Sequence, residues 1–217
     1  MDKIDYKKIY KDLYLPKTEP TLIHIPEMKF IQIHGKGNPN DRNGEYPKAV
    51  ETLYALSYGI KMMPRNGITP EGYFDYVVPP LEGLWWLEDD SDRNFTQKSK
   101  FLWTSMIRQP DFVTEELFME VLHKVSKKKP DLPILQCELV SFSEGLCVHC
   151  MHYGSFDEEQ ITVDKMDQYI KDYNLFYDFT NIRKHHEIYL SDPRKTAAAK
   201  LKTVIRHPVK SSTNEIG

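Results

Sequence analysis

The segment Lys184–Lys195, KHHEIYLSDPRK, carries the clearest structural signal in the chain. It predicts a short strand that ends at a Ser-Asp-Pro turn over residues 191–193. Because alternate side chains of a strand share a face, we expect His185, Glu187 and Tyr189 on one face and a mainly apolar set, residues 186, 188 and 190, on the other. A carboxylate in the middle of a strand is costly to bury unless it has a partner or a ligand. Glu187 is therefore the first candidate for a functional residue.

Size and charge narrow the class of protein around this strand. The 217 residues are enough for one large domain or two small ones. A content of 40 % hydrophobic and 28 % charged residues is typical of a soluble globular protein. The net charge of −3 leaves no basic surface that would attract nucleic acid, so we expect no direct nucleic-acid partner.

Targeting signals and cysteines favour the cytoplasm. No apolar run approaches the roughly 20 residues needed to cross a membrane, and the N-terminus lacks the apolar core of a signal peptide. We therefore expect no membrane association. The cysteines, Cys137, Cys147 and Cys150, are odd in number, and the second CxxC pair that a zinc site would need is absent. They are expected to be buried free thiols that pack as small hydrophobic groups.

Periodicity and turn residues divide the rest of the chain into elements. Residues 1–21 predict an N-terminal arm or short helix, and residues 210–217 a disordered tail. Helices are predicted over residues 47–63, 114–127 and 161–173. Strands are predicted over residues 28–34, 73–78, 83–87, 100–108, 184–190 and 202–209, with a hairpin of strands 134–142 and 146–152 around Ser-Glu-Gly.

The two halves of the chain, about 22–110 and 111–209, follow one plan. Each has a strand that ends in histidine and glycine, His34 and Gly37 in the first half and His152 and Gly154 in the second. A polar loop, an amphipathic helix and two strands follow in both. This order predicts an α+β fold in which duplicated strand-helix-strand-strand units form a pseudo-twofold antiparallel sheet with a central ligand cleft.

Four segments carry a resemblance to a known family: GKGNP at 35–39, PLEGLWW at 80–86, HYGSFDE at 152–158 and HHEIYLSDP at 185–193. With these segments the chain resembles the GyrI-like small-molecule-binding family, in particular its stand-alone branch, over about residues 22–209. The third segment is similar to the family's His-x-Gly-Pro-Tyr-x-Glu loop, with Ser155 in place of the proline and Phe156 in place of the tyrosine.

The resemblance implies a single domain with an aromatic cleft that binds flat, hydrophobic, often cationic molecules. It also implies a glutamate anchor, which falls on Glu187. Some stand-alone members are hydrolases that open the cyclopropane ring of DNA-alkylating natural products. We therefore expect a protein that binds electrophilic xenobiotics and hydrolyses such rings. The alternatives are a non-catalytic protein that sequesters or senses drugs, and a gyrase-type partner-binding module.

Two residues are the catalytic candidates. Glu187 would take a proton from water, and Tyr189 would donate a hydrogen bond to developing negative charge. Glu187 also has a structural interpretation, as the partner of Arg183, Lys184 or a histidine. The candidate ligand contacts are Glu187, His185, Phe156, Trp85, Trp86, Trp103, Tyr76 and Glu82.

The ligand contacts are not equally specified by the sequence. Trp85 and Trp86 are adjacent, so at most one of them is expected to line the cleft while the other packs in the core. Trp103 and Tyr76 would be further walls or core residues. Glu82 is either a second cleft acid or an exposed turn residue.

A metal ion or other cofactor is not expected from the sequence. A metal site needs three or four convergent ligands, and the neighbouring His185 and His186 diverge on a strand. No HxH or HxxxH pair with a nearby acid appears, and no GxSxG motif supports covalent catalysis. The expected partner is a hydrophobic small molecule, bound by a monomer or homodimer.

Overall fold

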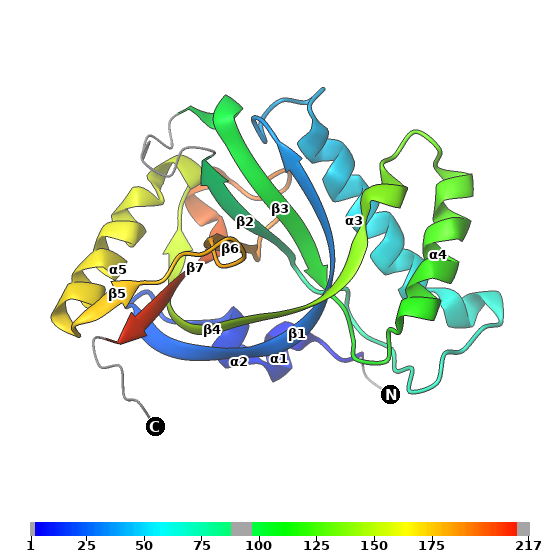
Figure 1. Cartoon of the computed structure of the whole chain (residues 1–217), viewed down its shortest axis with the longest axis horizontal. Coiled ribbons are helices and arrows are strands. Elements are labelled where there is room, and N and C mark those ends of the chain that lie inside the picture. The colour runs from blue at the N-terminus through cyan, green and yellow to red at the C-terminus, as the bar shows by residue number, and fades with distance from the viewer. Residues whose placement is uncertain (1–2, 88–96, 212–217) are drawn as a thin grey trace. The chain divides into compact units, whose positions relative to one another are not determined.

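The two halves of the chain fold on the same plan. The computed structural model describes residues 3–87 and 97–211 and divides the chain into two units. Unit 1 consists of residues 1–9 and 28–142, and unit 2 of residues 10–27 and 143–217. Each unit holds a strand, a helix and two further strands in that order, and unit 2 has one additional short strand directly after its helix (Figure 1). This confirms the α+β class and the duplicated strand-helix-strand-strand plan.

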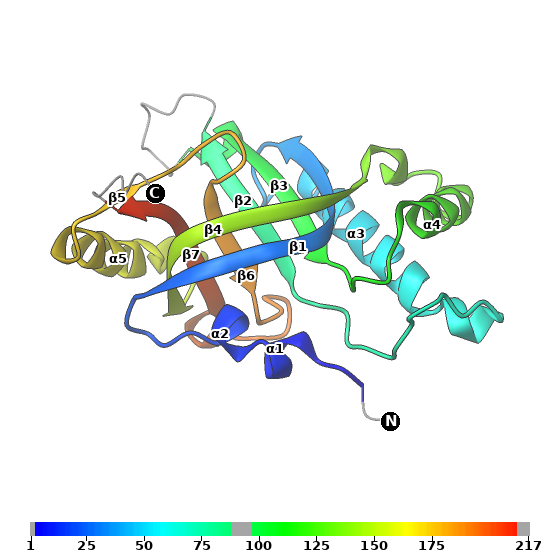
Figure 2. The same cartoon turned by 60° about the horizontal axis from the view of Figure 1, so that its bottom comes forward.

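Unit 1 is built on a three-stranded antiparallel sheet. Its strands are β1 (Thr21–Lys36), which begins in unit 2, β2 (Leu81–Leu87) and β3 (Phe101–Arg108). β3 lies between the other two and pairs antiparallel with both (Figure 2). The short helix α1 (Tyr6–Ile9) also belongs to this unit.

Two helices cover unit 1. Helix α3 (Glu45–Lys61) packs on β3 and on α4 (Glu115–Lys128). The backbones of the two helices approach closely at Gly59, where a Cβ atom would lie 2.7 Å from Cγ1 of Val121. α4 begins as the sequence predicts, because the Thr114 hydroxyl accepts a hydrogen bond from the Leu117 N–H.

Unit 2 repeats this sheet with a different helix. Its central strand β7 (Lys202–Ser211) pairs antiparallel with β4 (Glu138–Tyr153), which begins in unit 1, and with β6 (His185–Tyr189). Helix α5 (Gln160–Asp172) covers the sheet, and a short strand β5 (Leu175–Tyr177) extends it. The core beneath α5 consists of Val148, Cys150, Met166, Ile170, Ile205 and Val209. Helix α2 (Lys11–Tyr14) belongs to this unit.

Single turns of 3₁₀ helix complete the described elements. They are Met63–Asn66, Lys98–Lys100, Ile134–Gln136, Phe156–Glu158 and Ala198–Lys200. The three cysteines are buried free thiols, as predicted.

Strand register aligns the two units residue by residue. His34 of β1 lies opposite Thr104 of β3, and His152 of β4 lies opposite Thr203 of β7. Two residues further along the central strands, Met106 lies opposite Glu82 and Ile205 opposite Glu187. When the units are aligned on their histidine-threonine pairs, Glu82 and Glu187 therefore occupy equivalent positions.

Two predicted elements are wrong. Residues 73–78 form no named strand; only an isolated bridge joins Tyr76 to Ile4, and the aromatic run packs against Phe112 instead. The hairpin over 134–152 is also absent, because β4 continues through Glu144 and Gly145. Glu144 is 1 % exposed and ion-paired, whereas a hairpin turn would have placed it in solvent.

The ends of the chain differ in detail from the expectation. Two short helices occupy the N-terminal residues, and β1 already begins at Thr21. Of the expected tail, Lys210 and Ser211 belong to β7, and residues 212–217 lie outside the described part. The domain boundaries inferred from the sequence stay a prediction.

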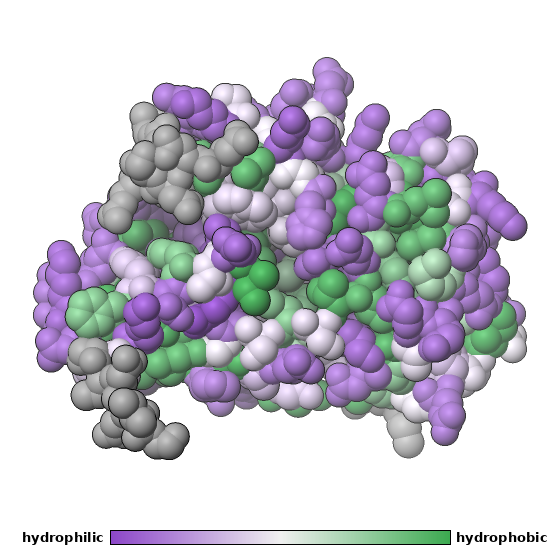
Figure 3. All heavy atoms as spheres, in the orientation of Figure 1, coloured by the Kyte–Doolittle hydropathy of each residue, from purple (hydrophilic) through white to green (hydrophobic). Residues whose placement is uncertain are grey.

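On the face shown in Figure 3, hydrophobic residues lie among hydrophilic ones. Within residues 3–87 and 97–211, every helix is too short or too polar to cross a lipid bilayer.

Candidate functional site

The predicted alternation of side chains along β6 is confirmed. His186 and Ile188 are buried, whereas His185, Glu187 and Tyr189 are half-buried. Glu187 lies opposite Ile205, and Ile205 packs with Met166 of α5. Because directly opposed residues share a face of the sheet, Glu187 lies on the face that α5 covers.

Glu187 is held by two histidines in series. Nε2 of His185 lies 3.2 Å from Oε1 of Glu187, and Nδ1 of His185 lies 2.7 Å from Nε2 of His207. Burial, together with the neighbouring His185, keeps the pKa of His207 well below its usual range, so this imidazole is neutral. A chain in which His207 donates to His185 and His185 donates to Glu187 satisfies both contacts. The interpretation of Glu187 as a histidine partner is thereby supported, and the chain also fixes the direction of its carboxylate.

A second carboxylate, Glu159, joins this group. Glu159 is the residue immediately before α5, and its backbone carbonyl accepts hydrogen bonds from Thr162 and Val163. One ligand atom each from Glu159, His185 and Glu187 lie within 4.8 Å of one another. Glu159 could not be predicted from the sequence, because no local pattern connects a helix-start residue with a strand 26 positions later.

Two further predicted residues lie close to each other in unit 2. The rings of Phe156 and Tyr189 meet edge to face, with centroids 5.6 Å apart. Phe156 stands just before α5, and Tyr189 follows Glu187 on the same face of β6. Four of the predicted site residues, His185, Glu187, Tyr189 and Phe156, therefore belong to unit 2.

The remaining predicted residues belong to unit 1. Trp85 and Trp103 are buried and lie opposite each other on β2 and β3, and the ring centroid of Tyr46 lies 5.3 Å and 5.2 Å from theirs. Trp86 is half-buried, so the adjacent tryptophans have different surroundings, as expected. Glu82 lies inside β2 with 1 % exposure, which rules out the exposed-turn alternative for this residue.

Tyr76 is a core residue of unit 1. It is fully buried, and its ring contacts those of Tyr73, Phe74 and Phe112. The ammonium group of Lys61 lies 5.2 Å from the ring centroid. Burial raises the pKa of the Tyr76 hydroxyl well above its usual range.

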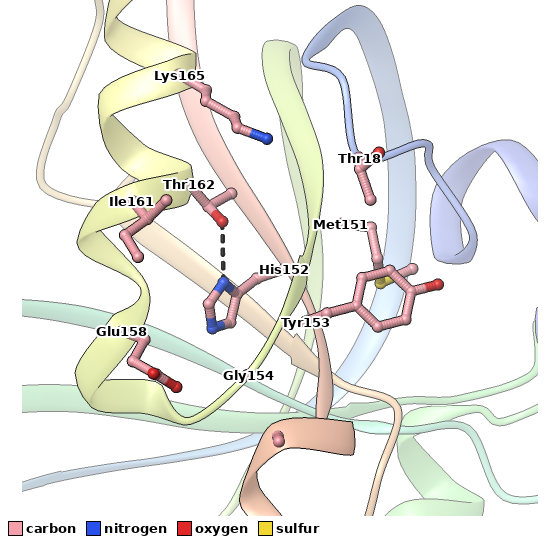
Figure 4. A pocket seen from close by; sticks show the side chains of 10 residues that line it. Thr18, Met151, His152, Tyr153, Gly154, Glu158, Ile161, Thr162 and Lys165 are labelled. Atoms are coloured by element: carbon pink, nitrogen blue, oxygen red, sulfur yellow. Dashed lines mark hydrogen bonds between the residues drawn. The ribbon is translucent and has the colours of Figure 1, made fainter.

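Unit 2 contains a pocket of about 330 Å³ between the end of β4 and α5 (Figure 4). His152 points into it from β4, and its Nδ1 lies 2.9 Å from the Thr162 hydroxyl of α5. The other ring nitrogen lies 3.0 Å from the carbonyl of Ser155, so Nε2 carries the proton. Glu158 and Lys165 bring one charge of each sign to the wall.

Unit 1 contains a second pocket, of about 350 Å³, in the corresponding place between β1 and α3. It is lined by His34, Trp103 and Glu45 among others. Gly35 keeps this region open for the indole, because a Cβ there would lie 2.2 Å from the Trp103 ring. Among the residues that the structure describes, Glu187 lines neither pocket, and the central cleft inferred from the sequence stays a prediction.

A buried ion pair occupies the other face of the sheet in unit 2. Oε2 of Glu144 accepts hydrogen bonds from Arg206 at 2.8 Å and from His186 at 3.0 Å. Nη2 of Arg206 donates to the carbonyl of Leu13, which ties α2 to the sheet. His186 is therefore part of the scaffold.

The fold agrees with comparisons to known proteins. The model of the GyrI-like small-molecule-binding domain matches residues 18–210. The chain belongs to the GyrI-like small-molecule-binding family. None of the curated proteins compared with this GyrI-like chain matches it.

Solved structures place the GyrI-like chain near proteins from Listeria innocua. A hydrolase from that organism is 47 % identical with a TM-score of 0.86, and an uncharacterized conserved protein is 48 % identical with a TM-score of 0.90. Both alignments cover 96 % of this chain and all of the other. The C-terminal domain of EcmrR, 12 % identical with a TM-score of 0.51 over 89 % of this chain and 98 % of that one, shares the fold.

Proposed function

We propose that this GyrI-like protein is a hydrolase that adds water to strained, electrophilic rings of flat hydrophobic molecules, cyclopropanes among them. The observation that carries the proposal is the placement of Glu187, whose carboxylate lies 3.2 Å from His185 while His185 is held at 2.7 Å by His207. A carboxylate fixed in this way is oriented to accept a proton from water. The hydrolase from Listeria innocua, 47 % identical to this chain, supports the same class of activity.

The reaction is a net addition of one water molecule. The carboxylate of Glu187 takes a proton from water while the water oxygen bonds to a ring carbon. The carbon–carbon bond to that carbon breaks, and its electron pair moves onto the electron-withdrawing group that activates the ring. Glu187 then returns the proton to this site, which yields a ring-opened alcohol.

Two neighbouring residues have supporting roles in this reaction. The Tyr189 hydroxyl donates a hydrogen bond to the group that receives the electron pair. The edge-to-face pair of Phe156 and Tyr189 offers an aromatic wall to a flat substrate. His185 and His207 are positioning residues, because they act through Glu187.

Glu187→Gln tests the proposal. The amide keeps the size of the side chain but is a very weak base, so ring opening of a cyclopropane-containing alkylator should slow by about 10²-fold or more. Product formation is followed by chromatography at equal protein concentration. Glu138→Gln, which changes an exposed carboxylate of β4, serves as the matched control and should retain the wild-type rate. Equal rates for wild type and Glu187→Gln would refute the assignment of Glu187 as the base.

A second candidate function is binding without turnover. It is favoured by the pocket in unit 1, where the Trp103 ring and the Glu45 carboxylate offer contacts to a planar cation. Titration with a planar cationic dye tests it through the dye's fluorescence. Tight binding that Glu45→Gln weakens, with no product from any alkylator, would favour sequestration over hydrolysis.

A further inference from the structure

We propose that Glu159, His185 and Glu187 bind one divalent transition-metal ion, of the manganese or zinc type. This metal site goes beyond the proposed hydrolase activity, and its test is metal binding, whether or not the protein is a hydrolase. The sequence predicted no metal site, because it does not show that a ligand from another element lies next to His185 and Glu187. β6 supplies His185 and Glu187 from one face of the strand, and the start of α5 supplies Glu159.

The ligand atoms are already close to the separation that a metal site requires. Ligands bound about 2.0–2.2 Å from a single ion lie roughly 3–4 Å from one another. Nε2 of His185 and Oε1 of Glu187 are 3.2 Å apart, and all three ligand atoms lie within 4.8 Å of one another. The three ligand atoms would have to draw closer on binding an ion, and all three residues are half-buried.

The donor set favours a first-row transition ion. Two carboxylate oxygens and one imidazole nitrogen suit Mn²⁺ and Zn²⁺, whereas Mg²⁺ and Ca²⁺ prefer sites made of oxygen alone. Two neighbouring carboxylates also repel each other when both are ionised, and a divalent cation between them removes that repulsion. Three protein ligands leave coordination positions open for water.

His207 provides the support that metal-binding histidines usually have. Such a histidine donates its second ring N–H to a neighbouring acceptor, which fixes its tautomer and direction. Nδ1 of His185 lies 2.7 Å from Nε2 of His207, and His207 is 4 % exposed. Without the metal, Nε2 of His185 carries the proton that faces Glu187. With the metal, that nitrogen binds the ion, so the proton moves to Nδ1 and points to His207.

Metal binding would change the role of Glu187. A carboxylate that coordinates an ion has one lone pair fewer for water, and the metal-bound water becomes the more acidic group. The metal-free and metal-bound proteins would then activate water in different ways. A direct measurement of metal binding tests the metal site separately from the hydrolase activity. The protein could bind the ion without hydrolysing any substrate, or hydrolyse a substrate without binding the ion.

The test is a titration of chelator-treated full-length protein with MnCl₂ and, separately, ZnCl₂, followed by calorimetry. Mn²⁺ is the main probe because it has little affinity for thiols, and the chain contains three. We expect one ion per chain. Glu159→Gln and Glu187→Gln should each weaken binding at least about 10-fold, and His207→Gln about 10- to 100-fold. Glu120→Gln and His123→Gln, which change exposed residues of α4, should bind as the wild type does.

A second readout needs no variant. In NMR spectra of ¹⁵N-labelled wild-type protein, Zn²⁺ should change the tautomer of both His185 and His207, so that the proton is found on the other ring nitrogen. The ring-nitrogen signals of His34 should stay unchanged. Three outcomes would each overturn the proposal. They are no binding of either ion by the wild type at 1 mM, an affinity that Glu159→Gln leaves unchanged in a folded protein, and unchanged NMR signals of His185 and His207.

Discussion

Nη1 of Arg206 donates a hydrogen bond to Oε2 of Glu144 over 2.8 Å, and each of these side chains is 1 % exposed. Arg206 also donates to the carbonyl of Leu13, so one guanidinium joins β7, β4 and the N-terminal segment. Removal of one partner leaves the other charge buried without its counter-ion, which costs more than the loss of the attraction.

Arg206→Met should therefore destabilise the protein by about 3–5 kcal/mol. Urea denaturation followed by circular dichroism measures this loss. Glu120→Gln, which breaks an exposed pair with Lys124 on α4, should cost no more than about 0.5 kcal/mol. The double variant Glu144→Leu/Arg206→Met should lose less than the sum of its single variants, because neither charge remains. Additive losses would show that the pair is not coupled.

Acid should destabilise unit 2 by protonating the carboxylate of Glu144. Burial acts to raise the pKa of Glu144, but the charges and hydrogen bonds of His186 and Arg206 outweigh it and lower the pKa from 4.5 to about 2. A depressed pKa contributes stability that is present above pH 4.5 and is lost as the pH falls toward 2. The free energy of unfolding that Glu144 contributes, and that is lost over this pH range, is about 3 kcal/mol.

Urea denaturation at several pH values between 2 and 7 checks this contribution. The wild type should lose about 3 kcal/mol more than Glu144→Gln does as the pH falls from 5 to 2. Glu138→Gln, at an exposed position of the same strand, should follow the wild-type profile. Parallel profiles for wild type and Glu144→Gln would contradict the depressed pKa.

Gly35→Ala should destabilise unit 1 by displacing an indole. The added Cβ would lie 2.2 Å from the Trp103 ring, a distance that requires the ring or the strand to move, at a cost of about 1–3 kcal/mol. Trp103→Leu should recover part of this cost when the two changes are combined. Gly37→Ala, where a Cβ meets nothing within 4 Å but φ is +97°, should be destabilising by backbone strain and show no coupling to Trp103. A double-mutant cycle in urea measures both couplings.

The three thiols should be inert in the folded protein. Burial raises the pKa of Cys137 to about 12 and that of Cys150 to about 11, and it raises the pKa of Cys147 as well. Since the thiolate is the reactive form, a disulfide-exchange reagent at pH 8 should label no thiol in buffer and three in urea. Rapid labelling of the native protein at any of the three positions would contradict their burial.

Tyr189→Phe should slow the proposed ring opening while leaving the fold intact. Loss of the hydroxyl removes a donor to developing negative charge, which typically costs about 10²-fold or more in kcat, and KM should change little because the aromatic wall with Phe156 remains. Steady-state kinetics separates the two constants. A rise in KM with unchanged kcat would reassign Tyr189 to substrate binding alone.

Local pattern was enough to predict much of the fold. The alternation of residues 185–189, the helix predicted over residues 114–127 and the duplicated order of strands and helix follow from patterns among neighbouring residues, and the structure confirms them. The hairpin predicted over 134–152 was wrong because Gly145 looked like a turn residue. Its φ of +70° is real, but the ion pair of Glu144 with Arg206 keeps the strand continuous, and Arg206 lies 62 residues away in sequence.

The candidate site was predictable only in part, because some of its contacts also join residues that are far apart in sequence. Residues His185, Glu187 and Tyr189 follow from alternation along one strand. Glu159 and His207 reach Glu187 and His185 through pairing of β6 with β7 and packing of α5, which no short sequence window contains.

The equivalence of Glu82 and Glu187 bears on how the molecule arose. A tandem duplication of one ancestral unit would give both copies the same acid at the same register position, and both copies retain it. The surroundings of the two acids differ, because Pro80 and Arg108 stand in unit 1 where unit 2 has His185 and His207. Such a duplication would account for the shared acid, whereas imidazoles stand at the two neighbouring register positions in unit 2 alone.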